Sequence, residues 1–413
     1  MVNVNGDGNV KMSNAPPIND VNMIRRKMKN IYANMTGCKM NDVRLKLQYK
    51  QNSNGCRTTK TGCSKNRLGG GAYGTAYKAY ANNGKTVPLV VKESTKQNKD
   101  DQESKIEHDT IKVLRNAGFS ENIPRVYGYK ICDKNEYLFS DLVKGVALKD
   151  FRPTSKDQLA SIVTQILYTL YKINKKIPSF RHHDLHQDNV MIVKDEVKDL
   201  IINDGQGRNY KFNNGGVKAV IIDFGLAYIA PNDANKYLSG GAVNPKVRNG
   251  NYKHSGIGSK SSPMYDAHFF LYCVYALINP NNRSRMRPAT NITNVNKKKE
   301  IEESMTRVRQ YIEKQFESRF LNMDDTTIIT GGRLTFKGQK GVKTNLLKLI
   351  QDINLIPVDT PPGSNTRTIL PQPRQGNQLP TVNQTNMKKL YKNLVAHQAK
   401  GRGSTRLGRT VVR

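Results

Sequence analysis

The sequence contains nine residues, HHDLHQDNV at positions 182–190, that decide how the chain is interpreted. They lie between a segment with an apolar stripe at helical spacing, residues 155–175, and an apolar run typical of a strand, residues 190–193. Asp184 could orient a hydroxyl group and accept its proton, and Asn189, five residues later, could bind a metal ion. A polar loop without function is the alternative, but such a loop seldom sits between a buried helix and a strand.

A second motif follows at residues 221–225, where an apolar, strand-like run ends in the letters IIDFG. An aspartate that ends a buried strand is costly unless its charge is compensated, for example by a cation. We therefore expect Asp223 to bind Mg²⁺ between the β- and γ-phosphates of a nucleotide.

A glycine-rich run, LGGGAYGTA, occupies residues 68–76. Gly69, Gly71 and Gly74 fit the pattern G-x-G-x-x-G, in which missing side chains let backbone N–H groups approach phosphate oxygens. Alone the pattern is weak, because a glycine-rich hairpin turn would look the same. A dinucleotide-binding fold would need a helix directly after the glycines. Residues 75–80 continue as a strand instead, which favours a loop that covers the phosphates of ATP.

A lysine, Lys92, ends the next apolar strand-like run. A lysine in this position is often only an edge residue with its charge in solvent. Its place after the glycine-rich run and before an acid-bearing helix at 102–117 favours contact with the α- and β-phosphates. We expect Glu107 to hold Lys92, because the apolar residues Ile111 and Leu114 follow it on the inner side of this helix. Glu103, one turn earlier, is the second choice.

Along the chain the four motifs follow one another as the glycine-rich run, Lys92, residues 182–190 and residues 221–225. In that order they resemble the protein kinase family over roughly residues 68–355. The resemblance implies an α+β, two-lobed fold: a small β-rich lobe with one key helix, a larger, mainly helical lobe, and ATP with Mg²⁺ as cofactors. We place the lobes at residues 61–145 and 146–356. The resemblance also implies a hinge at Asp141 to Val143 that contacts the nucleotide, and an aspartate, Asp266, that supports the 182–190 loop.

The chain departs from the family pattern at several positions. His183 replaces the arginine that commonly binds a phosphate on the activation segment, so such control is not expected. His186 replaces the lysine usual in serine/threonine kinases. No A-P-E motif stands between Gly225 and Asp266, and residues 195–216 form an insertion.

Three functions remain open at this point. The first is a serine/threonine protein kinase that transfers the γ-phosphate of ATP to a protein hydroxyl. The second is a kinase-fold structural or nucleic-acid-binding protein, against which the complete catalytic set argues. The third is a small-molecule phosphotransferase, because the D-L-H-x-x-N wording is also similar to aminoglycoside and choline phosphotransferases. The motif D-F-G and the glycine-rich loop argue against the third.

The charge of the chain is unusual. The 413 residues include 67 Lys plus Arg against 33 Asp plus Glu, a formal net charge of +34. Such a surface attracts polyanions, including nucleic acid. Residues 1–60 form a basic extension, and residues 357–413 form a basic tail whose composition predicts disorder.

The expected location is intracellular. Five cysteines without a regular framework fit a reducing compartment, and no signal peptide or run of about 20 apolar residues is present. We therefore expect a soluble protein. The divergent activation segment, the Y-D-x-H-F-F run at 265–270 and the Asn/Lys-rich composition are similar to kinase-like proteins of large DNA viruses. This likeness adds a virion or a virus factory as a possible location.

Overall fold

The computed structural model describes residues 67–71, 74–80, 88–96, 102–132, 134–203, 208–241, 244–282 and 285–353. The predicted N-terminal extension, residues 1–60, and the predicted tail, residues 357–413, lie outside them. The chain divides into two compact units. The first comprises residues 1–108 and 125–142, and the second comprises residues 109–124 and 143–413.

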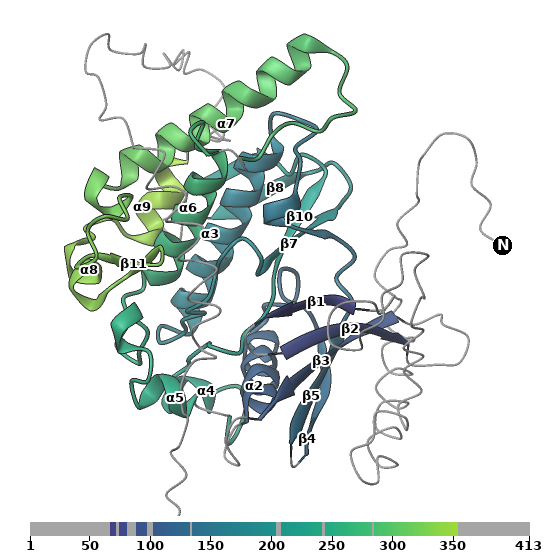
Figure 1. Cartoon of the computed structure of the whole chain (residues 1–413), viewed down its shortest axis with the longest axis vertical. Coiled ribbons are helices and arrows are strands. Elements are labelled where there is room, and N and C mark those ends of the chain that lie inside the picture. The colour runs from purple at the N-terminus through teal and green to yellow at the C-terminus, as the bar shows by residue number, and fades with distance from the viewer. Residues whose placement is uncertain are drawn as a thin grey trace, which may run out of the picture. The chain divides into compact units, whose positions relative to one another are not determined.

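The first unit contains a five-stranded antiparallel sheet with the order β1-β2-β3-β5-β4. The strands are β1 (Arg67–Gly71), β2 (Gly74–Tyr80), β3 (Pro88–Thr95), β4 (Val126–Ile131) and β5 (Asn135–Asp141), as Figure 1 shows. Their β-branched and aromatic residues favour extended backbone. Val91 of β3 pairs with Phe139 of β5, and both are fully buried, so the middle of the sheet forms a core beside Lys92.

Helix α2 (Glu103–Asn116) carries the glutamate predicted to hold Lys92. Its apolar residues Ile106, Ile111 and Leu114 are buried, as their helical spacing predicts. The boundary between the two units crosses this helix at Asp109.

The second unit is mainly helical. Its central helix is α3 (Gln158–Lys176), whose apolar stripe is at most 1% exposed at Leu159, Ile162, Ile166, Leu170 and Ile173. Helices α6 (Tyr265–Ile278), α7 (Val295–Gln315) and α9 (Leu346–Asp352) pack around it (Figure 1). Together with the sheet-rich first unit, these helices confirm the predicted α+β organisation.

A small sheet in the second unit brings two of the predicted motifs together. Its order is β10-β7-β6, with β6 (Val146–Ala147), β7 (Val190–Lys194) and β10 (Val217–Ile221). Strand β7 starts directly after Asn189, and β10 ends two residues before Asp223. The antiparallel register pairs Val190 with Ile221. Asn189 and Asp223, the two predicted metal-binding residues, therefore lie at the same end of this strand pair.

The insertion predicted at residues 195–216 forms a hairpin of β8 (Asp199–Asn203) and β9 (Asn209–Asn213). The remaining elements of the second unit are short. They are η3 (Leu148–Asp150), α4 (Pro231–Ala234), α5 (Pro245–Arg248), η4 (Lys253–Ser255), η5 (Ser318–Phe320), β11 (Ile329–Thr330), β12 (Arg333–Leu334) and α8 (Phe336–Gly341).

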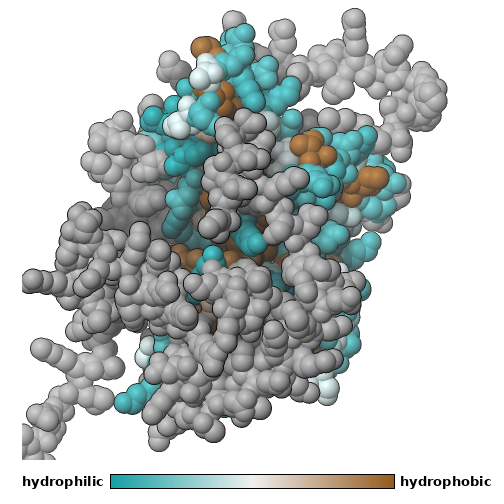
Figure 2. All heavy atoms as spheres, turned by 90° about the vertical axis from the view of Figure 1, so that its right-hand side faces the viewer, coloured by the Kyte–Doolittle hydropathy of each residue, from teal (hydrophilic) through white to brown (hydrophobic). Residues whose placement is uncertain are grey.

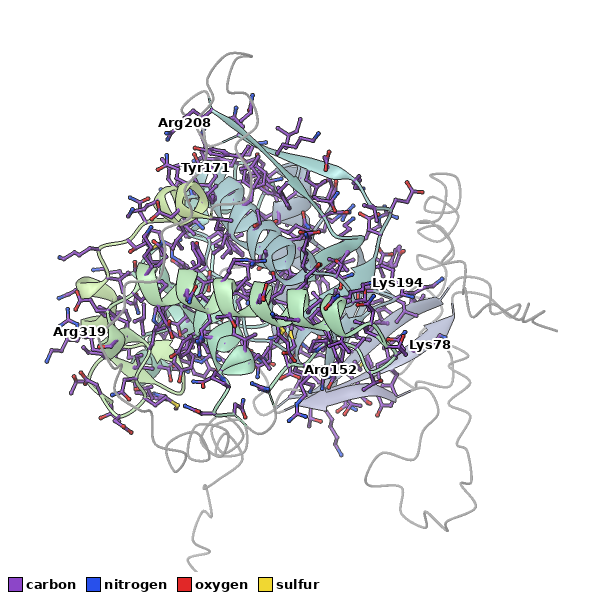
Figure 3. All side chains as sticks on the ribbon, turned by 90° about the horizontal axis from the view of Figure 1, so that it is seen from above. Lys78, Arg152, Tyr171, Lys194, Arg208 and Arg319 are labelled. Carbon is purple, nitrogen blue, oxygen red and sulfur yellow. The ribbon has the colours of Figure 1, made fainter. Side chains whose placement is uncertain are left out.

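On the face that Figure 2 shows, most of the visible described residues are hydrophilic. Large apolar side chains are exposed at Leu68, Val146, Val197, Ile201 and Val295. Basic side chains such as Lys194, Arg208 and Arg319 extend outward from the ribbon (Figure 3). Within the described residues, no helix combines the length and the apolar character that crossing a bilayer requires.

Two cysteines lie in the described part of the chain. Cys273 is a buried free thiol, and burial raises its pKa to about 12, which keeps it protonated.

Candidate active site

The HHDLHQDNV loop is fixed by a buried aspartate of helix α6. Asp266 is 1% exposed, and its two oxygens accept the backbone N–H groups of His182 at 2.7 Å and His183 at 2.8 Å. Hydrogen bonds to an ionised carboxylate are stronger than those between neutral groups. Asp266 therefore fixes the backbone immediately before Asp184, which is the support predicted for it.

Two non-glycine residues of the described chain adopt a left-handed backbone, His183 with φ 64° and Asp223 with φ 62°. Such conformations cost about 1–3 kcal/mol each and persist only where the surroundings enforce them. His183 directly precedes Asp184, and Asp223 is itself a predicted metal ligand. The strain is therefore concentrated at the predicted site.

Both carboxylate oxygens of Asp184 have partners. Oδ1 accepts a hydrogen bond from Nη2 of Arg333, a residue of strand β12. Oδ2 lies 3.3 Å from Nδ2 of Asn189 and 3.6 Å from Nε2 of His186. The side chain of Asp184 is 15% exposed, so these contacts form in a largely water-free environment.

The charges around Asp184 fix its protonation state. Burial alone would raise the pKa of Asp184, but the charges of Arg333 and His186 lower it well below its usual range. Burial would lower the pKa of His186, yet Asp184 and Asp188 raise it to about 9. At neutral pH, Asp184 is therefore a carboxylate, and the same contacts favour the protonated form of His186.

Asn189 and Asp223 present oxygen ligands suited to Mg²⁺. Nδ2 of Asn189 donates to the carbonyl of Asp184 at 2.8 Å, so its Oδ1, which accepts no hydrogen bond from the described residues, is left for a cation. The N–H of Ile222 donates to the carbonyl of Asn189, which places Asp223 beside it. The described residues contain no cluster of three His, Cys, Asp or Glu side chains for a metal. This donor set fits Mg²⁺, which commonly combines one or two carboxylates with phosphate oxygens and water.

His183 occupies the position where an arginine was expected from the family pattern. It is fully buried, and burial lowers its pKa to about 4, so it is neutral near pH 7. Its Nδ1 lies 3.1 Å from the carbonyl of Leu226, and its Nε2 lies 3.1 Å from the hydroxyl of Ser261. A neutral, enclosed imidazole cannot pair with a phosphate as an arginine does, which agrees with the prediction from sequence.

In the first unit, the predicted glycines lie on the β1–β2 hairpin, where Gly71 pairs with Gly74. A Cβ at Gly74 would lie 2.2 Å from the carbonyl oxygen of Glu93, so packing requires glycine there. A Cβ at Gly69 would meet no atom within 4 Å. Among the described residues, packing therefore gives no reason for glycine at 69.

Lys92 is paired with Glu107, the partner predicted first. Nζ of Lys92 lies 2.8 Å from Oε2 of Glu107, and the two side chains are 20% and 7% exposed. The N-terminus of α2 is held in turn by Glu136 of β5, which accepts the N–H groups of Ser104 at 2.8 Å and Glu103 at 3.3 Å. A carboxylate at this end of a helix satisfies its unpaired donors. Glu136 therefore positions the helix that carries Glu107.

The two predicted hinge residues fall on either side of the boundary between the units. The carboxylate of Asp141 accepts hydrogen bonds from the hydroxyl of Tyr127 and, at 3.1 Å, from the N–H of Arg125. The carbonyl of Val143 accepts the N–H of Gly145 at 3.0 Å. Their contact with a nucleotide stays a prediction.

Two residues of this arrangement are missing from the predicted set, Arg333 and Glu136. No motif surrounds either of them. The Gly331-Gly332 pair before Arg333 is a hairpin signal, but it does not reveal what the hairpin contacts.

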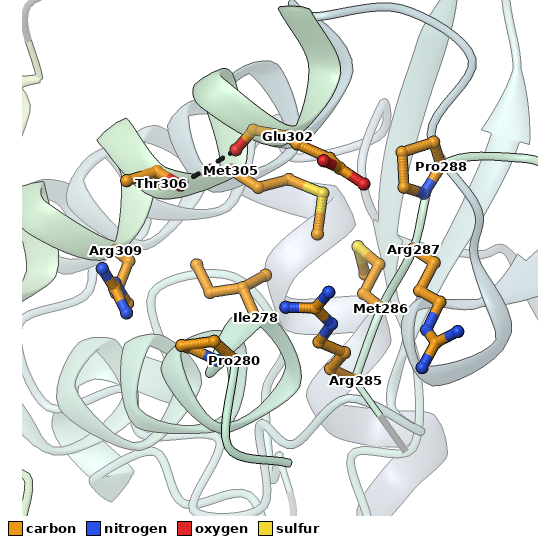
Figure 4. A pocket seen from close by; sticks show the side chains of 10 residues that line it. All are labelled: Ile278, Pro280, Arg285, Met286, Arg287, Pro288, Glu302, Met305, Thr306 and Arg309. Atoms are coloured by element: carbon orange, nitrogen blue, oxygen red, sulfur yellow. Dashed lines mark hydrogen bonds between the residues drawn. The ribbon is translucent and has the colours of Figure 1, made fainter. Parts of the chain in front are cut away.

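A cavity of about 210 Å³ lies elsewhere in the second unit, between the end of α6 and α7 (Figure 4). Its apolar part includes Ile278, Met286 and Met305, and its charged rim includes Arg285 and Glu302. None of the predicted catalytic, nucleotide-binding or metal-binding residues lines it, so it is not a candidate for the reaction site.

The chain resembles known protein kinases. Residues 63–249 match the protein kinase domain family. A protein named "Putative serine/threonine-protein kinase R400" of Acanthamoeba polyphaga mimivirus is 26% identical over 165 residues, which are 39% of this chain and 34% of that protein. "Probable kinase 098L" of Invertebrate iridescent virus 3 is 26% identical over 185 residues, 44% of this chain and 32% of that protein.

A third relative is "Serine/threonine-protein kinase D" of Synechocystis sp., 31% identical over 81 residues, which are 19% of this chain and 16% of that protein. The chain thus aligns with about a third or less of the length of each relative. The family match and the sheet-rich and helical regions confirm the predicted kinase fold. Residues 63–249 are therefore a divergent protein kinase domain.

Proposed function

We propose that this protein kinase transfers the γ-phosphate of Mg-ATP to serine or threonine hydroxyls of proteins. The observation that supports the proposal best is the state of Asp184. Asp184 is ionised, and it belongs to a loop whose backbone Asp266 fixes. It lies beside Asn189, and Asp223 follows the strand that pairs with the strand after Asn189. Two of the relatives carry serine/threonine-protein kinase in their names.

Each predicted residue has a role in this reaction. Asp184 orients the acceptor hydroxyl and takes its proton as the oxygen attacks the γ-phosphorus and the bond to the β–γ bridging oxygen breaks. Asn189 and Asp223 would hold Mg²⁺, which supplies positive charge to the phosphates when bound. Because the pKa of Asp184 is low, its main contribution is to orient the hydroxyl rather than to act as a strong base.

The first unit supplies the phosphate contacts. The β1–β2 hairpin offers backbone N–H groups at Gly69 and Gly71, and Lys92 binds the α- and β-phosphates while Glu107 holds its ammonium group. In the second unit, His186 takes the place of the family's lysine as a cation beside Asp184.

The acceptor class is tested by incubating the protein with labelled Mg-ATP and three sets of acceptors: basic proteins, acidic proteins, and aminoglycosides with choline. The proposal expects label on serine or threonine of proteins and no turnover of the small molecules. Turnover of small molecules alone would establish a small-molecule phosphotransferase instead.

We further propose a polyanion partner, for which the net charge of +34 is the support. Binding of DNA to the full chain should weaken steeply as salt rises from 50 to 200 mM, by roughly tenfold or more if several phosphates are neutralised. Binding that does not respond to salt would remove this partner. The viral relatives support a virus-related origin, and we propose the virus factory or the virion as the location.

A further inference from the structure

Arg333 contacts the predicted catalytic aspartate from a distant part of the chain. It lies on β12, in the hairpin that β11 and β12 form, and 149 residues separate it from Asp184. The turn of this hairpin is Gly331-Gly332, with φ of 59° and 83°, a conformation that glycine adopts readily.

The guanidinium group of Arg333 bridges two neighbouring groups of the loop. Nη2 donates to Oδ1 of Asp184, and Nη1 donates to the backbone carbonyl of His183. Its centre lies 4.3 Å from the ring centre of Phe269, in cation–π geometry. Because a guanidinium group is planar and rigid, its two donors hold Oδ1 of Asp184 and the carbonyl of His183 at a fixed spacing.

The backbone of Arg333 is held as firmly as its side chain. A Cβ at Gly332 would lie 2.8 Å from the ring of Tyr272, so the hairpin packs closely against helix α6. On the other side, the carbonyl of Leu334 accepts a hydrogen bond from the side-chain amide of Gln339 at 3.1 Å. Arg333 is therefore fixed at both ends, and its side chain is only 17% exposed.

The loop itself lacks another strong cation on this side of Asp184. His183 is neutral and directed toward Leu226 and Ser261, and His186 approaches the other carboxylate oxygen at 3.6 Å. Burying Asp184 without a close partner would be costly. Arg333 supplies that partner, and a carboxylate with about four lone-pair sites retains capacity for an acceptor hydroxyl.

We propose that Arg333 is a positioning residue for phosphoryl transfer: it sets the orientation of the Asp184 carboxylate from outside the catalytic loop. This inference rests on the proposed kinase function. Displacing a catalytic group by about 1 Å can reduce a rate on the order of 100-fold. Loss of Arg333 should therefore lower kcat while leaving the KM for ATP near the wild-type value.

The test compares Arg333→Ala and Arg333→Lys with wild type in steady-state transfer from Mg-ATP to a protein acceptor. The matched control is Arg319→Ala, because Arg319 also lies over a phenylalanine ring, at 4.8 Å, and pairs with Glu317, but is 50% exposed. We expect kcat to fall on the order of 100-fold for Arg333→Ala and about tenfold for Arg333→Lys, with the control unchanged. Methylguanidine should restore part of the activity of Arg333→Ala, because it can occupy the vacated space.

The outcomes separate the two proposals. A wild type that transfers no phosphate removes the kinase function and this role with it. If wild type is active and the Arg333 variants are equally active, the role of Arg333 is refuted but the kinase function is not. A rise in kcat in the variants would show that Arg333 obstructs the site. If circular dichroism shows that Arg333→Ala is unfolded, the folded Arg333→Lys variant decides. A wild-type kcat in that variant overturns the inference, and a lower kcat with an unchanged Tm supports it.

Discussion

The carboxylate of Asp266 lies 2.8 Å from the backbone nitrogen of His183, although 83 residues separate them in the sequence. With the matching bond to His182, this contact lets one buried side chain of α6 hold the strained backbone that precedes Asp184. The position of Asp184 thus depends on a side chain of a distant helix.

Asp266→Asn should therefore impair both stability and transfer. The amide is neutral and has one acceptor oxygen, so one of the two backbone N–H groups loses its acceptor and the other is left with an uncharged one. We expect the free energy of unfolding to fall by roughly 2–3 kcal/mol. The value of kcat should fall at least about tenfold, since a displaced loop misplaces Asp184. Urea unfolding and steady-state kinetics measure the two effects; an unchanged kcat would show that the loop needs no anchor.

The Lys92–Glu107 pair should behave as one unit in ATP use. Lys92→Met removes the cation for the phosphates, and Glu107→Gln leaves that cation without its carboxylate. We expect each single variant to lower kcat/KM for ATP by about tenfold or more. The fold-loss of kcat/KM in the double variant should be much smaller than the product of the two single fold-losses. Lys130→Met on β4 is the control. Effects of the two changes that simply multiply would argue against coupling.

Glu136 should stabilise the helix that carries Glu107. Glu136→Ala removes the acceptor for the N–H groups of Ser104 and Glu103, and losing such a helix cap costs about 0.5–2 kcal/mol. Hydrogen exchange of the first turn of α2 should become faster in this variant. Unchanged protection in that turn would mean that other contacts hold the helix end.

Acid sensitivity should be visible at His268. Its Nε2 lies 2.8 Å from the carbonyl of Phe320, its Nδ1 is buried without a partner among the described residues, and burial lowers its pKa to about 4. The unfolded chain takes up this proton near pH 6.5, well before the folded one. Stability contributed by neutral His268 is thus complete above about pH 6.5 and lost as the pH falls toward 4.

The variant His268→Gln isolates this effect. Between about pH 6 and 4.5, the free energy of unfolding should fall more steeply for wild type than for the variant. The difference approaches 1.4 kcal/mol per pH unit, the equivalent of one proton. Denaturant unfolding across this range gives both slopes, and equal slopes would contradict a depressed pKa for His268.

The sequence predicts what local patterns encode. The apolar stripe of α3 and the mostly apolar α6 predict those helices to within a few residues, because burial favours such patterns. The four motifs likewise indicate Lys92, Asp184, Asn189 and Asp223, whose chemical roles stay predictions. These residues lie next to the glycines, strands or loops that make them recognisable.

Contacts between distant residues are not predictable in this way. Arg333 contacts Asp184, which lies 149 positions earlier in the sequence. The residues that flank Arg333 do not distinguish it from the other arginines of this basic chain. Glu136 stands in a strand where a charged residue suggests solvent exposure, yet it is 1% exposed because the end of α2 covers it. Both are set by tertiary packing.

The most direct test of the account is single-turnover transfer of labelled phosphate from Mg-ATP to a protein acceptor by wild type, Asp184→Asn and the surface variant Asp199→Asn. Asp184→Asn keeps the shape of the side chain but removes the carboxylate, so the account predicts a loss of rate of about 100-fold or more for it alone. Wild-type rates in both variants would contradict the assignment of Asp184, and absence of transfer by folded wild type would contradict the kinase activity itself.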